Sequence, residues 1–425
     1  MKSPIALVCV LPLLCSAELR TLTLREVLDI ALKQNPDILI ARFDEQKAAE
    51  AVRIARDPFT PRVIVGSGLA YTSGFPMSVE GSAPSIVQAR VIQSVYNKPR
   101  SYEVAAAREN LRGAGIDVAA KRDEVVYKTA LLYLDCEQIA RSLDVATQQL
   151  ASFEKIGETT RARVQESREL PIEQKRAELQ IAQARQRVAQ LDADRDHAEG
   201  TLALVLGFGA DDRVRAVERK EALAAPATEE ASVESALTNS KELKRLESAM
   251  QVRGLEARSA RAARLPQMDL IAQYGLFAKF NNYDDFFRRF DRHNGQVGVS
   301  IAVPILPGGG APARAAQAEI EMSRLRTQVA AARDRITLDT RKAFHDIRRS
   351  ESATEIARLD LEVAREQLSI LLAQFTEGRA TLRQVEEARN AESGKWLLFY
   401  EARHAAERAL LELLRHTGML SASIK

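Results

Sequence analysis

The chain has 425 residues, and its 61 Lys and Arg against 58 Asp and Glu give a formal net charge of +3, which defines no partner by charge alone. A hydrophobic fraction of 46% with 28% charged residues excludes a disordered chain. Only 5% of the residues are aromatic, with a single Trp396. This composition favours long helices rich in Ala, Leu, Glu and Arg over the ring-filled cores of large enzymes.

The first predicted element is a signal peptide at residues 1–17. Lys2 precedes an apolar run at 5–14 and the small residues up to Ala17, an order typical of an exported chain cleaved after Ala17. The run is about ten residues long, too short for a helix across ~30 Å of hydrocarbon. A lipid-modified Cys15 is an alternative, although Leu14 is larger than the residue such sites prefer.

No segment after the signal peptide has the ~18 consecutive apolar residues of a transmembrane helix. An exported chain of this kind is either soluble or a membrane β-barrel. Past the signal peptide the only cysteine is Cys136, so the exported chain has no internal disulfide.

The rest of the sequence contains an internal repeat of two similar halves. Residues 31–38 align with residues 236–243, and Tyr133 and Gly207 align with Phe344 and Gly418, 211 positions later (344 − 133; 418 − 207). We therefore expect a first repeat at 18–206, a connector at 207–230 and a second repeat at 231–425. Each repeat is predicted to follow the order helix, strand, strand, long helix, helix.

In the first repeat, residues 24–56 are predicted to be helical, with a break before Pro36 because a proline disfavours helical geometry in the residue before it. Apolar residues then alternate with small or polar ones at about 62–72 and 86–96, and in the second repeat at about 267–278 and 295–304. A period of two predicts strands, each about the nine to eleven residues of a tilted transmembrane strand. An ordinary soluble sheet packed on a helix is the alternative. Four strands cannot close a barrel, so a membrane role requires several chains.

The long helices form hairpins at about 100–206 and about 310–417. One apolar series repeats every seven residues, and its counterpart 211 residues later is interrupted only by Ser350. The first series is Val104, Leu111, Val118, Val125, Leu132, Ile139, Ala146 and Phe153. Such a period predicts a supercoiled helix, and the small residues of the seams permit close packing against many neighbours. The far tips are expected at residues 165–171 and 376–382.

These features resemble the TolC-like outer-membrane factor family. The resemblance covers nearly the whole exported chain and rests on residues 22–36, on the duplicated order, on residues 303–310 and on the tip 169–173. It implies a mainly α fold with a membrane β-barrel portion: a homotrimer with a 12-stranded barrel in the outer membrane and an α-helical tunnel through the periplasm. The implied function is the exit duct of a tripartite efflux pump or type I secretion system.

The resemblance also implies a gate and an adaptor-docking site at the tips. In the second tip Gly378 matches the family glycine, Phe375 takes a tyrosine position and Glu387 an acidic one, whereas Gln384 and Ala380 depart from an expected acid and arginine. In the first tip Glu173 matches an acidic position and Ser167 replaces the glycine. The candidate tip residues are Ser167, Arg168, Glu169, Glu173, Phe375, Gly378, Arg379 and Glu387. Solvated charges on a helical turn are the alternative reading.

The implied partners are two further copies of the chain, a periplasmic adaptor (membrane fusion) protein, an inner-membrane pump and outer-membrane lipid. We expect no catalytic residues, metal or cofactor, because the five histidines show no ligand spacing and no phosphate loop or nucleophile motif occurs. No nucleic-acid partner is expected. In the duct that the resemblance implies, the aromatic loop 280–290 is expected at the lipid interface or the barrel mouth, and an ordinary packed surface loop is the alternative. A soluble periplasmic coiled-coil scaffold or adaptor-like protein is the alternative function, and the cargo is not predicted.

Overall fold

A computed structural model describes residues 19–68, 85–217, 228–278, 288, 291–305, 308–377 and 379–420, with the backbone alone at Leu382. The predicted signal peptide at 1–17 and the aromatic loop 280–290, apart from Arg288, lie outside these residues. None of the described helices is apolar over a stretch long enough to cross a membrane.

Contacts divide the chain into two compact units. The first combines residues 1–40, 121–240 and 335–425, and the second combines residues 41–120 and 241–334. Each unit draws on both halves of the sequence, so the compact units do not follow the expected repeat bounds of 18–206 and 231–425.

The first helix of the first unit is capped. α1 (Leu24–Gln34) starts after Thr23, whose hydroxyl accepts from the Glu26 N–H, while the Thr23 N–H donates to the Glu26 carboxylate at 2.8 Å. α2 (Pro36–Arg56) follows after the break that the proline predicted. Asn35 occupies the break: its side-chain oxygen accepts from the Asp37 N–H at 2.9 Å and its amide donates to the Val205 carbonyl at 2.7 Å.

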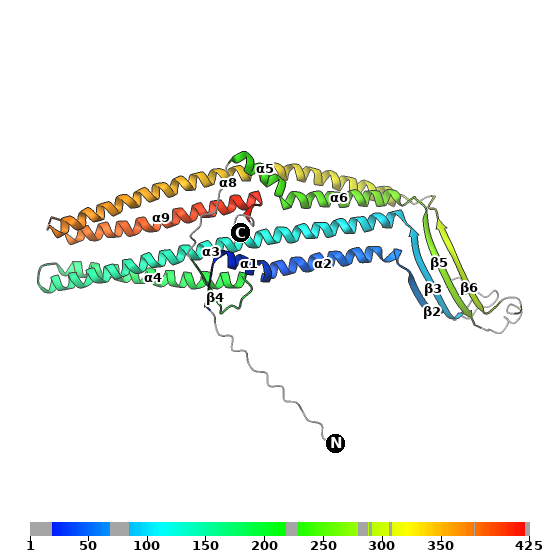
Figure 1. Cartoon of the computed structure of the whole chain (residues 1–425), viewed down its shortest axis with the longest axis horizontal. Helices are drawn as coiled ribbons and strands as arrows, with labels where there is room; N and C mark the ends of the chain where they lie inside the picture. The colour runs from blue at the N-terminus through cyan, green and yellow to red at the C-terminus, as the bar shows by residue number, and fades with distance from the viewer. Residues whose placement is uncertain are drawn as a thin grey trace, which may run out of the picture. The chain divides into compact units, whose positions relative to one another are not determined.

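Four long helices form the two predicted hairpins. α3 (Lys98–Gln165) and α4 (Pro171–Val205) make the first, and α8 (Gly310–Thr376) and α9 (Leu382–Thr417) the second (Figure 1). Every residue of the seven-residue series in α3 and of its counterpart in α8 is buried or half-buried. The period of seven therefore identified the packing seams.

The core of the first unit gathers residues from α1, α3, α4 and α9. Val27, Ala31, Tyr133, Leu202 and Leu411 are each at most 1% exposed. Burial of a large apolar side chain contributes roughly 1.5–3 kcal/mol, so this cluster is a main source of stability for the unit.

A two-stranded parallel sheet, which the sequence did not predict, closes over this core. β1 (Leu19–Leu22) pairs with β4 (Arg213–Ala216). The hydroxyl of buried Tyr133 lies 2.6 Å from the Val217 carbonyl oxygen and accepts from the Val217 N–H at 3.0 Å, so it holds the end of β4. Strands of four residues are too short for a two-residue period to identify them.

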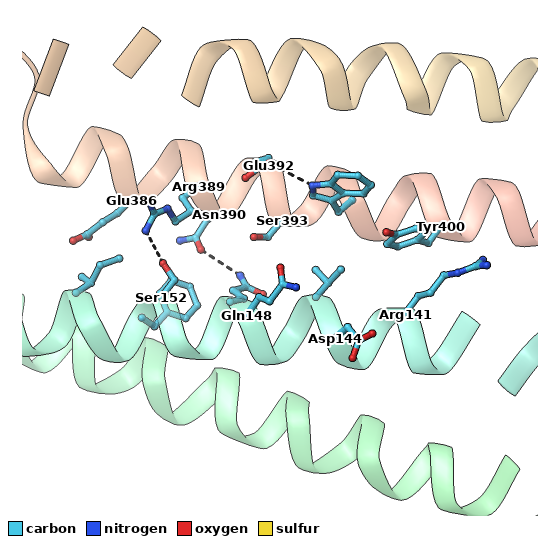
Figure 2. A pocket seen from close by; sticks show the side chains of 15 residues that line it. Arg141, Asp144, Gln148, Ser152, Glu386, Arg389, Asn390, Glu392, Ser393 and Tyr400 are labelled. Carbon is cyan, nitrogen blue, oxygen red and sulfur yellow. Dashed lines mark hydrogen bonds between the residues drawn. The ribbon is translucent and has the colours of Figure 1, made fainter. Parts of the chain in front are cut away.

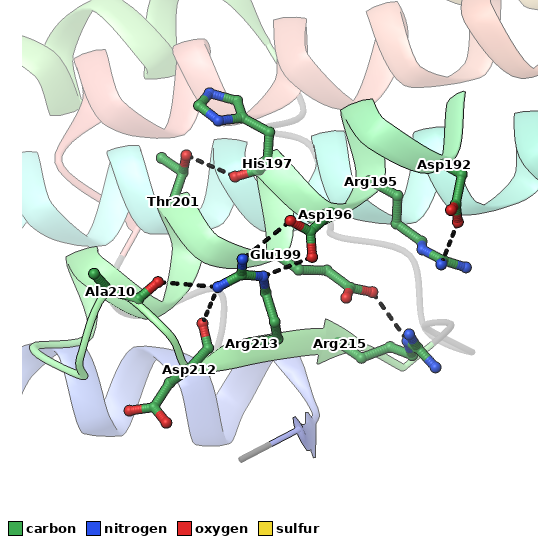
Figure 3. A network of polar contacts seen from close by, with 10 residues as sticks. All are labelled: Asp192, Arg195, Asp196, His197, Glu199, Thr201, Ala210, Asp212, Arg213 and Arg215. Carbon is green, nitrogen blue, oxygen red and sulfur yellow. Dashed lines mark hydrogen bonds and ion pairs between the residues drawn. The ribbon is translucent and has the colours of Figure 1, made fainter. Parts of the chain in front are cut away.

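Ion pairs attach β4 to α4, as Figure 3 shows. The Arg213 guanidinium donates to both carboxylate oxygens of Asp196 at 2.7 and 3.0 Å and to the carbonyls of Ala210 and Asp212, both at 3.0 Å. Arg215 donates to the buried Glu199 at 2.9 Å. The Asp196 carboxylate on α4 therefore stays close to a strand from the expected connector.

The second unit holds a four-stranded antiparallel sheet with the order β2-β3-β5-β6 (Figure 1). The strands are β2 (Arg62–Gly68), β3 (Ser85–Tyr96), β5 (Gln267–Phe277) and β6 (His293–Ala302). The short helix η1 (Asp57–Phe59) precedes β2, and α6 (Lys241–Ala262) precedes β5; α5 (Glu229–Asn239) belongs to the first unit. The central β3–β5 pair joins a strand of each sequence half.

The two faces of this sheet differ in polarity. The cross-strand register aligns apolar residues on one face: Val63, Val65, Val87, Ala89, Val91, Leu270, Ala272, Tyr274, Leu276, Val297, Val299 and Ile301. That face also carries Gln93 and His293, but none of its paired positions is Asp, Glu, Lys or Arg. On the outer strands the residues of this face are exposed to solvent: Val65 of β2 is 68% exposed and Val297 of β6 is 79% exposed. A large exposed apolar surface of this kind marks an interaction site.

Cys136 provides a test of the first-unit core. The thiol is 3% exposed, and burial together with nearby carboxylates raises its pKa to about 12. Because the thiolate is the reactive form, the exported protein should react negligibly with a disulfide reagent at pH 8 and should react fully in guanidinium. A Gln190→Cys variant, at an exposed position of α4, is the control and should react at once. Rapid reaction of Cys136 in the native protein would contradict this core.

Candidate gate and docking site at the helical tips

The first tip is a helix-ending turn centred on Ser167. The Arg168 N–H donates to the Arg163 carbonyl at 2.8 Å and the Ser167 N–H donates to the Val164 carbonyl at 3.0 Å. This pair of bonds is the Schellman motif, whose central residue adopts the left-handed conformation. Ser167 does so with φ of 56°, and it is the one non-glycine residue with positive φ in the described part of the chain. Glycine adopts this conformation most easily, which fits the glycine that the resemblance implies at this position.

The second tip repeats the turn 211 residues later. The Arg379 N–H donates to the Gln374 carbonyl at 2.8 Å, the counterpart of the bond from Arg168 to Arg163. Gly378 itself lies outside the described residues. α9 then begins after Thr381, which shares a capping box with Gln384. The residue that departs from the expected acid at 384 therefore caps the helix, because an amide can fill the same capping role as a carboxylate.

Replacement of Ser167 by glycine tests the turn. Glycine enters the left-handed region without the penalty that a side chain incurs, so Ser167→Gly should stabilise the first tip by ~1 kcal/mol, and Ser167→Val should destabilise it. Hydrogen exchange of the amides of residues 163–170 reports the change. Equal protection in all three proteins would show that the turn carries no strain.

A cleft of about 270 Å³ lies between α4 and the start of α9, within the first unit. We call it the tip cleft. Its walls bring together three of the predicted site residues, Glu169, Glu173 and Glu387. The other lining residues are Thr160, Arg176, Ala177, Gln180, Arg383, Glu386 and Asn390. The cleft is therefore a surface of carboxylates interleaved with arginines, contributed by both hairpins.

Most charges of the tips form ion pairs within their own hairpin. Glu173 accepts from Arg176 at 2.7 Å, and Glu387 accepts from Arg383 at 2.9 Å. Glu169 Oε2 lies 3.8 Å from an Arg163 nitrogen. The Arg383–Glu387 pair is exposed, and the carboxylates of the other two pairs are half-buried. Pairs that water reaches contribute only ~0–1 kcal/mol each, so they hold the tips weakly.

The structure leaves the other predicted residues outside the cleft. Arg168 and Arg379 are exposed and pair with their own turns, at 3.2 Å to Glu166 and 3.2 Å to Glu377. Ser167 shapes its turn, and Phe375 is half-buried near the end of α8. None of these four lines the tip cleft.

Glu386 is the acidic residue of α9 that lies deepest in the tip cleft. It was not among the residues predicted from the sequence. Burial raises its pKa, and the carboxylates of Glu169, Glu173 and Glu387 add to the rise, while Arg163 opposes it. A helical period would have found it, because Glu386, Arg389 and Asn390 share one face of α9. Glu387, the predicted residue, is exposed.

The raised pKa of Glu386 predicts a pH dependence. Because the folded tip holds this proton more tightly than the unfolded chain, stability falls as pH rises from the ordinary Glu pKa of 4.5 through the raised folded value. After correction for intrinsic rates, amide protection at residues 383–390 should therefore decrease over that range. Glu386→Gln should remove the decrease. The matched Glu387→Gln, at an exposed carboxylate paired with Arg383, should retain most of it, because Glu387 makes the smallest of the contributions to the raised pKa. The same slope in the Glu386→Gln protein would refute the assignment.

A second cleft, of about 570 Å³, lies between α3 and α9 and shares Glu386 and Asn390 with the tip cleft (Figure 2). Gln149 donates to Asn390 at 3.3 Å and Arg389 donates to Ser152 at 2.9 Å across it. Trp396 stacks on Tyr400 with ring centroids 5.5 Å apart. At this cleft the two hairpins therefore meet through polar side chains beside a small aromatic cluster, whereas farther along α9 they share the apolar core.

Comparisons with known proteins agree with this architecture. A family model described as outer membrane efflux protein matches residues 27–208 and 232–419. The outer membrane efflux protein BepC of Brucella suis biovar 1 (strain 1330) is 21% identical over 409 residues, which cover 94% of this chain and 86% of BepC.

Two solved structures have similar folds. The Campylobacter jejuni CmeC outer membrane channel superposes with a TM-score of 0.76 at 14% identity, covering 93% of this chain and 85% of CmeC. The outer membrane protein VceC from Vibrio cholerae gives a TM-score of 0.75 at 16% identity, covering 93% of this chain and 96% of VceC.

Proposed function

The chain belongs to the outer membrane efflux protein family, and on that premise we propose that three copies of it form one closed duct through the outer membrane. Membership makes the chain an outer-membrane efflux channel and favours this reading over a soluble periplasmic scaffold. The proposal adds the trimer, the gate and the partners.

The four-stranded sheet is the observation that carries the proposal. Its outer strands, β2 and β6, each have one side without a partner strand among the described residues. In hydrocarbon an unpaired backbone group costs several kcal/mol, and the smallest spanning barrels have about eight strands. Three copies supply twelve strands, with β6 of one copy beside β2 of the next. The apolar face then meets lipid and the polar face lines the pore.

The helical hairpins are the proposed periplasmic tunnel, and their tips the gate. Weak ion pairs within each hairpin suit a gate, because contacts that contribute little each can be exchanged for contacts with a partner. We propose Ser167, Arg168, Glu169, Glu173, Phe375, Gly378, Arg379 and Glu387 as gate or adaptor-docking residues. The periplasmic adaptor docks there, and the inner-membrane pump supplies cargo and energy. The duct itself performs no catalysis.

The oligomeric state and conductance of the detergent-extracted protein test this function. We expect a trimer that conducts ions across a planar bilayer. Val299→Lys places a charge on the apolar face, where lysine costs about 2–4 kcal/mol at mid-membrane, and should sharply reduce the trimer in the outer-membrane fraction. The matched Ser300→Lys, one residue along β6 on the polar face, should assemble normally. A soluble periplasmic monomer would overturn the proposal.

The gate has a narrower test. Glu387→Ala removes the acceptor of Arg383 on α9 and should raise the single-channel conductance or the open time, because a tip contact is lost. Arg379→Ala should act in the same direction. Lys175→Ala, an exposed charge on α4 that does not line the tip cleft, is the control. Conductance equal to that of the unaltered protein would remove both residues from the gate.

A further inference from the structure

The charged residues of the four-stranded sheet are unevenly distributed. At the paired positions of the described strands, Arg62, Arg90 and Asp269 all lie on the face opposite the apolar one. Their neighbours on this face are neutral: Ile64, Gly66, Gln88, Ile92, Ser94, Ile271, Gln273, Gly275, Asn294, Gln296, Gly298 and Ser300. At these paired positions the polar face therefore carries two cations and one anion per chain.

Arg90 occupies the middle of this polar face. It lies opposite Ile64 of β2 and Gln273 of β5, and Gln273 lies opposite Gln296 of β6, so its row offers no carboxylate. Arg90 is exposed, and no carboxylate of a described residue pairs with it. A cation that neighbouring carboxylates do not neutralise keeps its field in the adjoining water.

Arg62 adds a second positive charge next to Arg90. Arg62 lies opposite Ile92, two residues from Arg90, so the two arginines are diagonal neighbours with Cα atoms about 7–8 Å apart. Both are exposed, which lets water reduce their repulsion.

Asp269 is too distant to cancel this charge. It lies opposite Ser94, four residues along β3 from Arg90, which corresponds to about 13 Å. That separation exceeds the Debye length of about 10 Å at 0.1 M salt. The Asp269 carboxylate is half-buried and accepts a hydrogen bond from the Ser94 hydroxyl at 2.6 Å, so it is held in place by its own neighbour.

We propose that Arg90, assisted by Arg62, is the residue that sets the charge preference of the barrel for its permeating solute, favouring anions. This inference rests on the proposed function, since three copies would turn the two arginines into six guanidinium groups around one lumen. The carboxylates of the tip cleft act at another point along the chain. The contribution of Arg90 is therefore measured as the difference in permeability ratio between the unaltered protein and the Arg90 variants, in which the tip carboxylates are the same.

Reversal potentials in planar bilayers under a tenfold KCl gradient measure this difference. Arg90→Gln should lower the chloride-to-potassium permeability ratio about twofold or more, and Arg90→Lys should keep it, because the charge is retained. Arg62→Gln should lower the ratio in the same direction. Asp269→Asn, which keeps an oxygen for Ser94, should raise it.

The outcomes separate the inference from the proposed function. An unaltered protein that forms no conducting pore would overturn the proposed duct. A conducting protein whose permeability ratio is the same after Arg90→Gln would overturn only the role of Arg90. If Arg90→Gln failed to form trimers, the Arg62→Gln and Asp269→Asn ratios would decide, since shifts of opposite sign support the inference and two unchanged ratios refute it.

Discussion

Backbone hydrogen bonding at the sheet edges is the constraint on which this structure depends. The described sheet has four strands, with outer strands β2 and β6 each paired on one side. An apolar face and open edges are incompatible with a stable isolated monomer in water or lipid, because both leave groups without suitable partners. The duplication satisfies this constraint only in part. Each repeat supplies two strands, and pairing of β3 with β5 joins the two pairs into one sheet. In the proposed duct, further copies of the chain supply the rest.

The long helices depend on a different constraint, which is close packing over their whole length. Their seams use small residues such as Ala146, Ala315 and Ala343 beside larger ones, so long helices can approach closely at several positions. Nearer the tips, the two hairpins make polar contacts, as between Gln149 and Asn390. Polar contacts can be exchanged for contacts with water, whereas the apolar core around Tyr133 and Leu202 holds α3, α4 and α9 together.

Sequence reasoning located the tips but did not select Glu386, the acidic residue of α9 that lies deepest in the tip cleft. The turns lie where the repeat placed them, and Ser167 takes the left-handed conformation that glycine adopts most easily. Glu387 was chosen on the family pattern, yet Glu386 lies deeper in the tip cleft. Adjacent helical residues point in different directions, so a shift of one position changes whether a carboxylate faces a neighbour or water. A family pattern alone does not show which of two adjacent carboxylates faces the cleft.

The sequence by itself determined the order of elements, the helix break before Pro36, the seams of the long helices and the two faces of the strands. These follow from local periods of seven and two and from proline geometry, which act over a few residues. Only the tertiary structure decided that β1 pairs with β4, that Arg213 meets Asp196, and that Arg90 and Arg62 are diagonal neighbours. Those contacts depend on the register and folding of segments far apart in the chain, which no local pattern records.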